Sequence, residues 1–210
     1  LGVILGRVEM LKSMLQDPNL NRDELKRVAD TIEVTGHRIE KIVKSMRTMA
    51  HQQSDREPFE RVMVSEIIED ALNWCQTRFL DHGVRLLKPE QMTKTRVECR
   101  SYQLVQVLVN LLNNSFDAVE NLSEKWVRIE VKDGVDWVEI SVTDSGKGIT
   151  EEVRKKIFDP FFSTKRVQYG SGLGLSISIG LVRQNKGELL YDSSSANTRF
   201  VMRLRTKQNS

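Results

Sequence analysis

The segment from Gln106 to Ala118, QVLVNLLNNSFDA, joins a strongly apolar helical pattern to a row of polar side chains. Asn110, Asn114 and Asp117 are spaced four and three residues apart, so they lie on one side of the predicted helix. Amide side chains at the edge of an apolar helix cost free energy unless they are hydrogen-bonded. They therefore either satisfy the backbone of a neighbouring loop or offer oxygen to a hard cation. Mg²⁺ prefers oxygen ligands and is typically shared with nucleotide phosphates.

Three further segments come later in the chain. Asp144–Ile149 (DSGKGI) puts a carboxylate at the end of a predicted strand, before glycines that let a ligand with an amino donor approach closely; alone, it also fits a simple turn. Phe158–Lys165 (FDPFFSTK) fits a hydrophobic loop anchor that ends in a lysine. Gly170–Leu175 (GSGLGL) opens a predicted helix, where backbone N–H groups and the positive end of the helix dipole face an anion.

Two other phosphate-binding loops share glycine-rich sequences with this last segment. A dinucleotide-binding Rossmann loop requires a strand directly before the glycines, whereas residues 163–169 are polar. A Walker A loop requires Gly-Lys followed by Ser or Thr, and this sequence does not occur there. The pattern therefore excludes both loops.

The region around the four segments alternates between strand and helix patterns. Ser65 and Ser101 are the expected N-caps of two of the helices, and Asp133-Gly134 indicates a hairpin turn between two strands. The predicted strands are 59–64, 84–87, 96–99, 127–131, 138–142, 188–191 and 199–204, and the predicted helices are 65–80, 101–119 and 173–184. This proportion predicts a two-layer α/β sandwich over residues 59–210.

Residues 1–50 carry apolar side chains at steps of three and four, which is typical of a coiled-coil-like seam. Pro18 breaks the pattern, and Asn21 with Glu24 resembles the capping box that begins a second helix. The seam positions are Leu1, Ile4, Val8, Leu11, Leu15, Leu25, Val28, Ile32, Thr35, Ile39, Ile42, Met46 and Met49. A lone hairpin buries little, so we expect two copies to form a dimeric four-helix bundle. From the heptads alone, a plain oligomerisation stalk is the favoured explanation. The polar residues 51–58 form the expected linker, and the fold class is α+β.

Composition restricts the function classes. The 210 residues carry a net charge of +3, with 29% charged and 39% hydrophobic residues, which excludes a strongly basic nucleic-acid binder and a disordered acidic tail. No apolar run approaches the roughly 18–20 residues of a membrane-spanning helix. Cys75 and Cys99 are too few for a disulfide scaffold, so we expect reduced thiols and a cytoplasmic location.

In their order and spacing, the four segments resemble the N box, first glycine box, F box and second glycine box of bacterial sensor histidine kinases. Residues 1–50 resemble the dimerisation and histidine-phosphotransfer hairpin of the same family. The resemblance implies a Bergerat-type ATP-binding sandwich after a helical dimer. The implied function is an ATP-dependent protein-histidine autokinase of a two-component system that uses ATP and Mg²⁺.

The resemblance also implies roles for single residues. Asn114 would coordinate Mg²⁺, and Asp144 would accept a hydrogen bond from the adenine amino group. Asn110 would support the triphosphate and Lys165 would lie near the phosphates, so both are the expected catalytic residues. The other expected ATP-binding residues are Gly146, Gly148, Gly170, Ser171, Gly172, Leu173, Gly174 and Thr198. Residues 150–172 would form a mobile lid over ATP.

The phosphoacceptor is the main departure from the family pattern. In the family, this histidine lies in a His-Glu-x-x-x-Pro-Leu stretch. The first residues of the chain, LGVILG, resemble the family sequence on the C-terminal side of that stretch. We therefore expect the acceptor to lie just upstream, and none in this chain. His37, His51 and His82 are expected to be solvated surface residues.

Two substitutions inside the N box also depart from the pattern. Asp117 stands where many members carry a basic residue, which argues against a cationic phosphate contact at that position. Asn110 stands where hydrolysing relatives carry a water-activating Glu, and because an amide cannot take up a proton, efficient ATP hydrolysis is disfavoured.

The resemblance implies two partners, a second copy of the chain through the hairpin and the receiver domain of a response regulator. Membrane contact is expected only through upstream regions, and no nucleic-acid partner is expected. Two alternatives remain. One is an ATPase related to the heat-shock chaperones and the MutL group, and the other is a non-catalytic scaffold that binds ATP to set its conformation.

Overall fold

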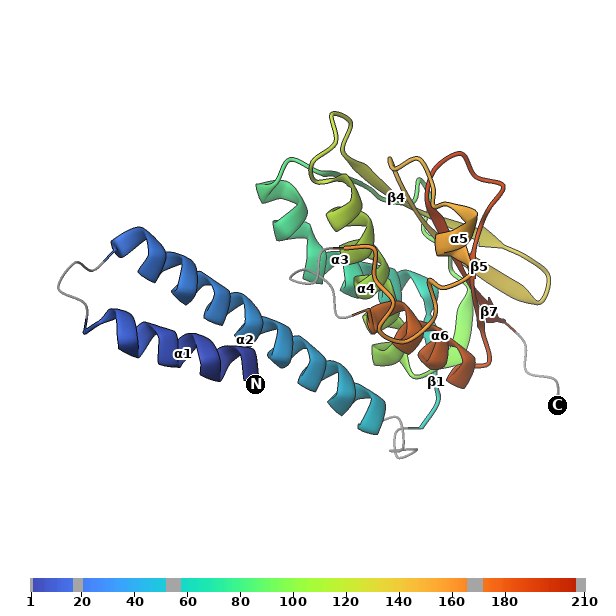
Figure 1. Cartoon of the computed structure of the whole chain (residues 1–210). Coiled ribbons are helices and arrows are strands. Elements are labelled where there is room, and N and C mark those ends of the chain that lie inside the picture. Colours follow the sequence, from blue (N-terminus) through green and yellow to red (C-terminus); the bar gives the residue numbers. More distant parts are fainter. Residues whose placement is uncertain (1, 17–20, 52–57, 166–171, 207–210) are drawn as a thin grey trace.

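The computed structural model describes residues 2–16, 21–51, 58–165 and 172–206. It has a helical N-terminal part followed by an α/β sandwich, which confirms the predicted α+β class (Figure 1). The linker expected at 51–58 falls almost wholly outside the described residues, so the domain boundaries stay predictions.

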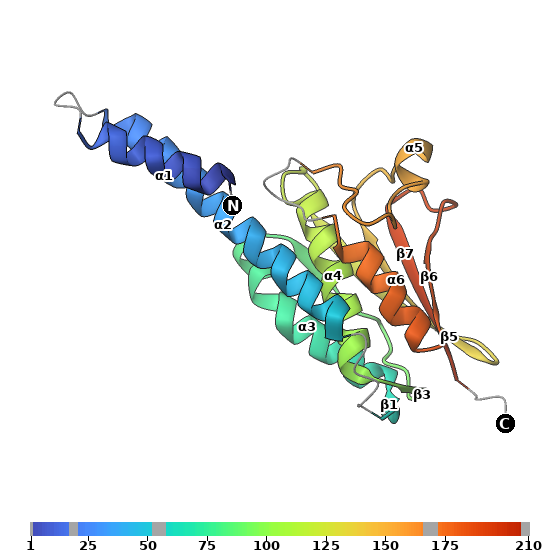
Figure 2. The ribbon, with the colours of Figure 1, turned by 60° about the horizontal axis from the view of Figure 1, so that its bottom comes forward.

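The N-terminal part is a hairpin of α1 (Gly2–Met14) and α2 (Arg22–His51), which lie side by side in both ribbon views (Figures 1 and 2). The side chain of Asn21 accepts hydrogen bonds from the backbone N–H groups of Asp23 (3.0 Å) and Glu24 (3.3 Å), which confirms its capping role. The break expected at Pro18 lies outside the described residues.

Burial in the hairpin follows the predicted seam in part. On α2, Val28 is buried, and Leu25, Ile32, Thr35 and Ile39 are half-buried. On α1 no residue is buried; Ile4, Val8 and Leu11 are half-buried. Leu15 follows the last residue of α1 and is exposed within one chain, so its place in the seam stays a prediction.

The sandwich packs its helices against a sheet in two layers. Its helices are α3 (Val64–Asp81), α4 (Ser101–Val119), α5 (Glu151–Arg154) and α6 (Gly174–Gln184). Its strands are β1 (Glu60–Met63), β2 (Arg85–Leu87), β3 (Arg96–Cys99), β4 (Trp126–Asp133), β5 (Trp137–Asp144), β6 (Glu188–Tyr191) and β7 (Arg199–Arg205). Five strands form a sheet in the order β2-β4-β5-β7-β6, and β1 pairs with β3 in a separate antiparallel pair. Helices α3, α4 and α6 cover one face of the large sheet (Figures 1 and 2).

The β4–β5 hairpin confirms the predicted turn. Asp133 pairs with Val138 at the end of the ladder, and the backbone N–H of Gly134 donates to the Trp137 carbonyl at 2.7 Å. This hairpin supplies the centre of the sheet, because β5 pairs with β4 on one side and β7 on the other. The site-bearing Asp144 is the last residue of β5.

The core lies between the sheet and its three helices. Helix α4 contributes the most continuous apolar face, and its buried positions recur every three or four residues as the sequence predicts. Fully buried side chains of α4 include Leu104, Leu108, Leu112 and Phe116. Because the apolar face of α4 is packed in the core, the polar face of the same helix is held pointing away from the core.

The predicted N-caps of two helices are wrong by one or two residues. Helix α3 begins at Val64 with Met63 as N-cap, and the Glu66 side chain accepts from the Met63 backbone N–H at 3.3 Å. Helix α4 has Arg100 as N-cap, so Ser101 is its first helical residue. In both places the preceding strand ends directly at the helix and fixes its start, which local capping propensity does not reveal.

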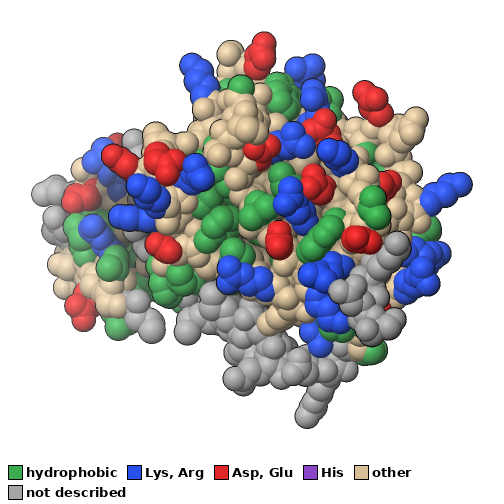
Figure 3. Space-filling model, turned by 90° about the vertical axis from the view of Figure 1, so that its right-hand side faces the viewer, with side chains coloured by type: hydrophobic (Ala, Val, Ile, Leu, Met, Phe, Trp, Pro, Cys, Tyr) green, Lys and Arg blue, Asp and Glu red, His purple; other side chains and the backbone are tan. Residues whose placement is uncertain are grey.

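The surface that Figure 3 shows carries acidic and basic side chains interspersed. One ion pair of the sheet joins Arg203 of β7 to Glu139 of β5, with 2.7 Å between Nε and Oε1. Within the described residues, none of the helices combines the length and apolar character that crossing a bilayer requires.

Candidate functional site

A cleft runs between α4, the start of α6 and the end of β5, and most of the predicted site residues line it. These are Asn110, Asn114, Asp144, Gly146, Gly148, Lys165, Gly172, Gly174 and Thr198. Gly170 and Ser171 lie outside the described residues. The structure brings nine of the twelve predicted residues to one cleft.

Leu173 differs from the other predicted site residues in the position of its side chain. Its side chain is almost fully buried in the core, so it does not face the cleft. The residue is the N-cap of α6, and its carbonyl accepts from the Ile177 backbone at 3.0 Å. The Leu173 side chain therefore holds the glycine-rich segment against the core, and only the Leu173 backbone is close to the cleft.

One end of the cleft is built around the buried carboxylate of Asp144. Its Oδ1 accepts from the Gly146 backbone N–H at 2.8 Å, and the hydroxyls of Thr198 and Ser115 also hydrogen-bond to the carboxylate. Burial raises the pKa of Asp144 above its ordinary value and outweighs these hydrogen bonds, which lower it. A buried carboxylate held in this way is a strong acceptor for a ligand N–H.

The backbone around Gly146 leaves space only for glycine. A Cβ at this position would lie 2.7 Å from Asp144 Oδ1 and 3.1 Å from Thr198 Oγ1. The Thr198 carbonyl accepts from the Asp144 backbone N–H at 3.0 Å, which ties β7 to the end of β5. Asp144, Gly146 and Thr198 thus form a small cradle that a flat ligand can approach closely.

Gly148 lies next in this wall with a φ of +80°, a conformation that favours glycine. Its neighbour Ile149 donates its backbone N–H to the Tyr191 hydroxyl at 3.1 Å. The Asn197 side chain donates to the Gly146 carbonyl at 3.1 Å. Two side chains from the β6–β7 region therefore fix the first glycine segment.

The other end of the cleft lies at the N-terminus of α6. Asn110 Nδ2 donates to the Ser178 hydroxyl at 2.9 Å, which joins α4 to α6. A Cβ on Gly174 would collide with Asn110 Oδ1, and a Cβ on Gly172, whose φ is +68°, would collide with the backbone of Phe161 and Phe162. Both glycines permit close packing at the point where the helix presents its N–H groups.

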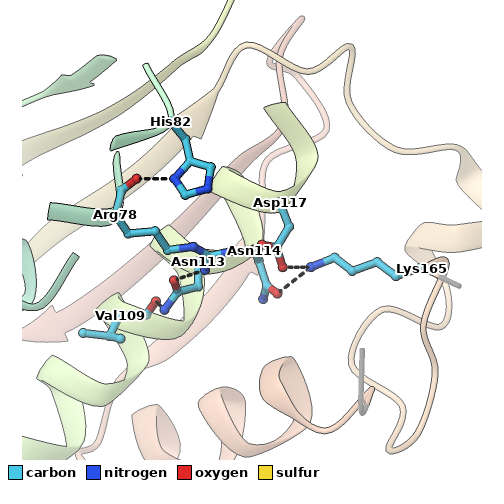
Figure 4. A network of polar contacts seen from close by, with 7 residues as sticks. All are labelled: Arg78, His82, Val109, Asn113, Asn114, Asp117 and Lys165. Carbon is cyan, nitrogen blue, oxygen red and sulfur yellow. Dashed lines mark hydrogen bonds and ion pairs between the residues drawn. The ribbon is translucent and has the colours of Figure 1, made fainter. Parts of the chain in front are cut away.

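A chain of charged side chains borders this end (Figure 4). Lys165 Nζ lies 2.6 Å from Asp117 Oδ2 and 3.4 Å from Asn114 Oδ1. On the other side of Asp117, Arg78 donates to Asp117 Oδ1 and to Asn113 Oδ1, each at 2.7 Å. The Arg78 guanidinium also stacks on the Phe116 ring, 4.0 Å from its centroid.

The residues present fit a hard cation shared with a ligand. Among the described residues, His, Cys, Asp and Glu side chains nowhere gather in threes that could hold a metal ion. The amide oxygen of Asn114 lines the cleft and is a hard oxygen donor of the kind Mg²⁺ prefers, whereas both oxygens of Asp117 are engaged by Arg78 and Lys165. A single amide donor leaves room for phosphate oxygens and water in the remaining positions.

Of the three histidines of the chain, His82 is the one whose side chain lies within the described residues. His82 is exposed at the C-cap of α3, and its Nδ1 lies 3.0 Å from the Arg78 carbonyl oxygen (Figure 4). This position agrees with the expected surface location. The side chains of His37 and His51 lie outside the described part of the chain.

Sequence reasoning missed several residues of the site. Arg78 lies 39 residues before its partner Asp117, and Tyr191 lies 42 residues after Ile149. Ser115 follows Asn114 directly, and its hydroxyl hydrogen-bonds to Asp144 in the same cleft. No local pattern identifies them, because each reaches the site through packing of elements far apart in sequence.

Comparison with known proteins places this geometry in a family. Residues 99–208 match the family model described as histidine kinase-, DNA gyrase B-, and HSP90-like ATPase. The two-component sensor PprA of Pseudomonas aeruginosa is 36% identical over 143 residues, which are 65% of this chain and 15% of PprA. This chain spans less than a third of the length of the curated relatives it matches.

Solved structures agree with the sequence comparison. The nucleotide-free catalytic domain of histidine kinase ThkA superposes with a TM-score of 0.63 at 27% identity, covering 71% of this chain and 97% of that domain. ThkA in complex with the response regulator protein TrrA superposes with a TM-score of 0.70 at 22% identity, covering 98% of this chain and 57% of that chain. The second likeness extends the shared fold to the helical hairpin.

Proposed function

The chain belongs to the histidine kinase-, DNA gyrase B- and HSP90-like ATPase family, and from this we propose that it is the ATP-binding and dimerisation core of a two-component sensor histidine kinase. Its activity is transfer of the γ-phosphoryl group of ATP to an imidazole nitrogen other than those of His37, His51 and His82. One observation carries the proposal: a single cleft joins a buried acceptor cradle at Asp144 to a cation-lined helix N-terminus at Gly174.

The Asp144 end of the cleft binds adenine. The ionised Asp144 accepts a hydrogen bond from the adenine amino group, and Gly146 leaves the base room beside Thr198. Because Asp144 is buried, this hydrogen bond is protected from competition with water.

The Gly174 end binds the triphosphate. Backbone N–H groups at the start of α6 and the Lys165 ammonium offer positive charge, and Asn110 braces the start of α6 through Ser178. Magnesium bound with the triphosphate supplies neutralisation of its negative charge, and Asn114 is the residue that would hold it. The protein thus positions the phosphoryl group and stabilises charge, with little covalent chemistry of its own.

Asn110 decides between transfer and hydrolysis. Its amide can donate and accept hydrogen bonds but cannot take up a proton from water. Its Nδ2 is already engaged with Ser178. This favours transfer of the phosphoryl group to a histidine. It disfavours release of free phosphate, which would be the activity of the alternative, a chaperone-like ATPase.

The hairpin supports a homodimer. None of the residues of helix α1 is buried within one chain, and the apolar side chains of Val3 and Leu5 are 60% exposed. Exposed apolar side chains that gather on one helix are expected to be covered by a partner. A second hairpin covers α1 and completes a four-helix bundle. A response regulator is the proposed acceptor of the phosphoryl group, as suggested by the complex of ThkA with TrrA.

The test incubates this chain and a version extended upstream of Leu1 with γ-labelled ATP. We expect acid-labile, base-stable label on the extended version alone. Phosphate release without label supports the ATPase, and ATP binding with neither label nor release supports the scaffold. Label on this chain by itself contradicts the assignment of the acceptor.

Asn114→Ala tests the cation assignment. Calorimetric titration with ATP in the presence and absence of Mg²⁺ is expected to show that the variant loses the Mg²⁺-dependent part of the affinity, because the amide oxygen is gone. Asn121→Ala, on the cleft rim, is the matched control. Unchanged Mg²⁺ dependence in Asn114→Ala removes this residue from the site.

A further inference from the structure

At the phosphate end of the cleft, the side chains of Lys165 and Asp117 form a short ion pair. Lys165 Nζ and Asp117 Oδ2 are 2.6 Å apart, and both side chains are about three-quarters shielded from solvent (Figure 4). The pair joins the end of the phenylalanine-rich segment to α4. The ammonium group that the proposed function assigns to ATP phosphates is therefore already neutralised in the nucleotide-free protein.

Arg78 holds the carboxylate of this pair in place. Its guanidinium is fixed by stacking on Phe116 and by the Asn113 side chain, and it binds the other oxygen of Asp117. Asp117 is thus oriented by α3 so that Oδ2 points toward Lys165. Of its two cationic partners, Arg78 is anchored on helix α3, whereas Lys165 lies outside the helices and strands.

The Lys165 ammonium also lies beside the oxygen that the proposed function assigns to the cation. Nζ lies 3.4 Å from Asn114 Oδ1, the oxygen assigned to Mg²⁺. A divalent cation on the same oxygen and an ammonium group at this distance repel each other. Binding of the magnesium–nucleotide complex therefore requires Lys165 to leave Asn114.

We propose that Asp117 is a positioning residue that holds Lys165 in the empty cleft, and that Mg·ATP displaces Lys165 from Asp117 and Asn114 and takes it as a phosphate partner. The proposal rests on the proposed ATP-binding function. Asp117 stays paired with Arg78 after the exchange, so its charge is not left uncompensated. The pair competes with the nucleotide, and it therefore lowers nucleotide affinity.

The first test needs no nucleotide. In ¹⁵N-labelled protein, the exchange of the Lys165 ammonium protons with water is followed by NMR. Asp117→Asn is expected to speed this exchange severalfold, because the carboxylate partner is lost, and Asp117→Glu is expected to restore slow exchange. Unchanged exchange in Asp117→Asn overturns the proposal.

The second test measures Mg·ATP affinity by calorimetry. Asp117→Asn is expected to bind about two- to fivefold more tightly, the range set by a partly shielded ion pair. In a Lys165→Gln background the same substitution is expected to give no gain. A gain that persists without Lys165 reflects plain repulsion between Asp117 and phosphate, and weaker binding in Asp117→Asn shows that the pair favours the nucleotide-bound state. Either result overturns the proposal.

Glu139→Gln is the matched control. It breaks the Arg203–Glu139 pair, which has a similar separation and exposure but lies outside the cleft. This variant is expected to leave both Lys165 exchange and Mg·ATP affinity unchanged. If the wild-type chain does not bind Mg·ATP, the proposed function fails, whereas the ammonium exchange still reports on the Lys165–Asp117 pair.

Discussion

The hairpin and the sandwich depart from ordinary burial in opposite directions. The sandwich buries a carboxylate, Asp144, at 1% exposure, whereas α1 exposes the apolar side chains of Val3 and Leu5 at 60%. A buried charge costs free energy unless its hydrogen bonds compensate, and an exposed apolar helix gains free energy when it is covered. The two departures fit the two partners proposed above, a nucleotide for the sandwich and a second hairpin for α1.

The two regions also differ in what stabilises them. The sandwich has a continuous core and stands on its own packing, while the hairpin within one chain has only Val28 buried among its described side chains. Substitutions confined to one of the two regions therefore test whether that region depends on its own partner.

The largest effect is expected in the sandwich core. Leu108→Ala removes a fully buried side chain of α4 and is expected to lower the free energy of unfolding by about 2–5 kcal/mol. Denaturant unfolding followed by near-ultraviolet circular dichroism measures it. Leu80→Ala, at an exposed leucine of α3, is the matched control and is expected to cost less than about 0.5 kcal/mol. Equal effects at the two positions contradict the core assignment.

Asp144→Asn is expected to separate binding from stability. It replaces an ionised acceptor by an amide, so ATP affinity falls by about 1.5–3 kcal/mol, the value of a hydrogen bond to a charged group. Titration calorimetry at pH 7 measures this loss.

The same variant is expected to be no less stable than the wild type at pH 7. Burial raises the pKa of Asp144 in the folded state above its unfolded value. The contribution of Asp144 to the stability of the wild type is therefore fully present below the unfolded-state pKa. It is lost as the pH rises through the folded-state pKa. Asn mimics the protonated form and is expected to remove this pH dependence from denaturant unfolding curves. A less stable variant at pH 7 shows that the carboxylate's hydrogen bonds outweigh its burial cost.

Leu5→Asp tests the hairpin side of the comparison. Because Leu5 is exposed within one chain, the substitution is harmless to a monomer. In a bundle of two hairpins it buries an unpaired charge, and the dimer dissociation constant is expected to rise at least about tenfold. Analytical ultracentrifugation measures it, and Ser13→Asp adds the same charge at an exposed polar position of α1. A dimer that tolerates Leu5→Asp excludes this face from the interface.

The smallest effect is expected at the start of α2. Asn21→Ala removes the side chain that accepts from the Asp23 and Glu24 backbones, which costs about 1 kcal/mol. Thermal unfolding followed by far-ultraviolet circular dichroism is expected to show that the hairpin loses its helicity at a lower temperature than in the wild type. Calorimetric ATP affinity is expected to stay the same, and a change in it shows that the hairpin and the cleft are coupled.

The sequence predicts those parts of the fold and site that depend on local pattern. Asn114, Asp144 and Gly174 reach one cleft because each stands at a defined place on its own helix or strand end. Leu173 belongs to the same segment, but its apolar side chain packs into the core, so only its backbone is available to a ligand, which the motif alone does not reveal. Arg78 could not be predicted, because its place beside Asp117 depends on how α3 packs against α4.

The contact between Gly174 and Asn110 couples two positions that are far apart in the sequence. A methyl group at 174 collides with the Asn110 amide oxygen, so even alanine there requires the residue at 110 to shift or shrink. A shorter residue at 110 in turn gives up the bond that joins α4 to α6. Each substitution alone is therefore expected to disturb the contact between α4 and α6, and the effects of the two on stability are expected to be non-additive.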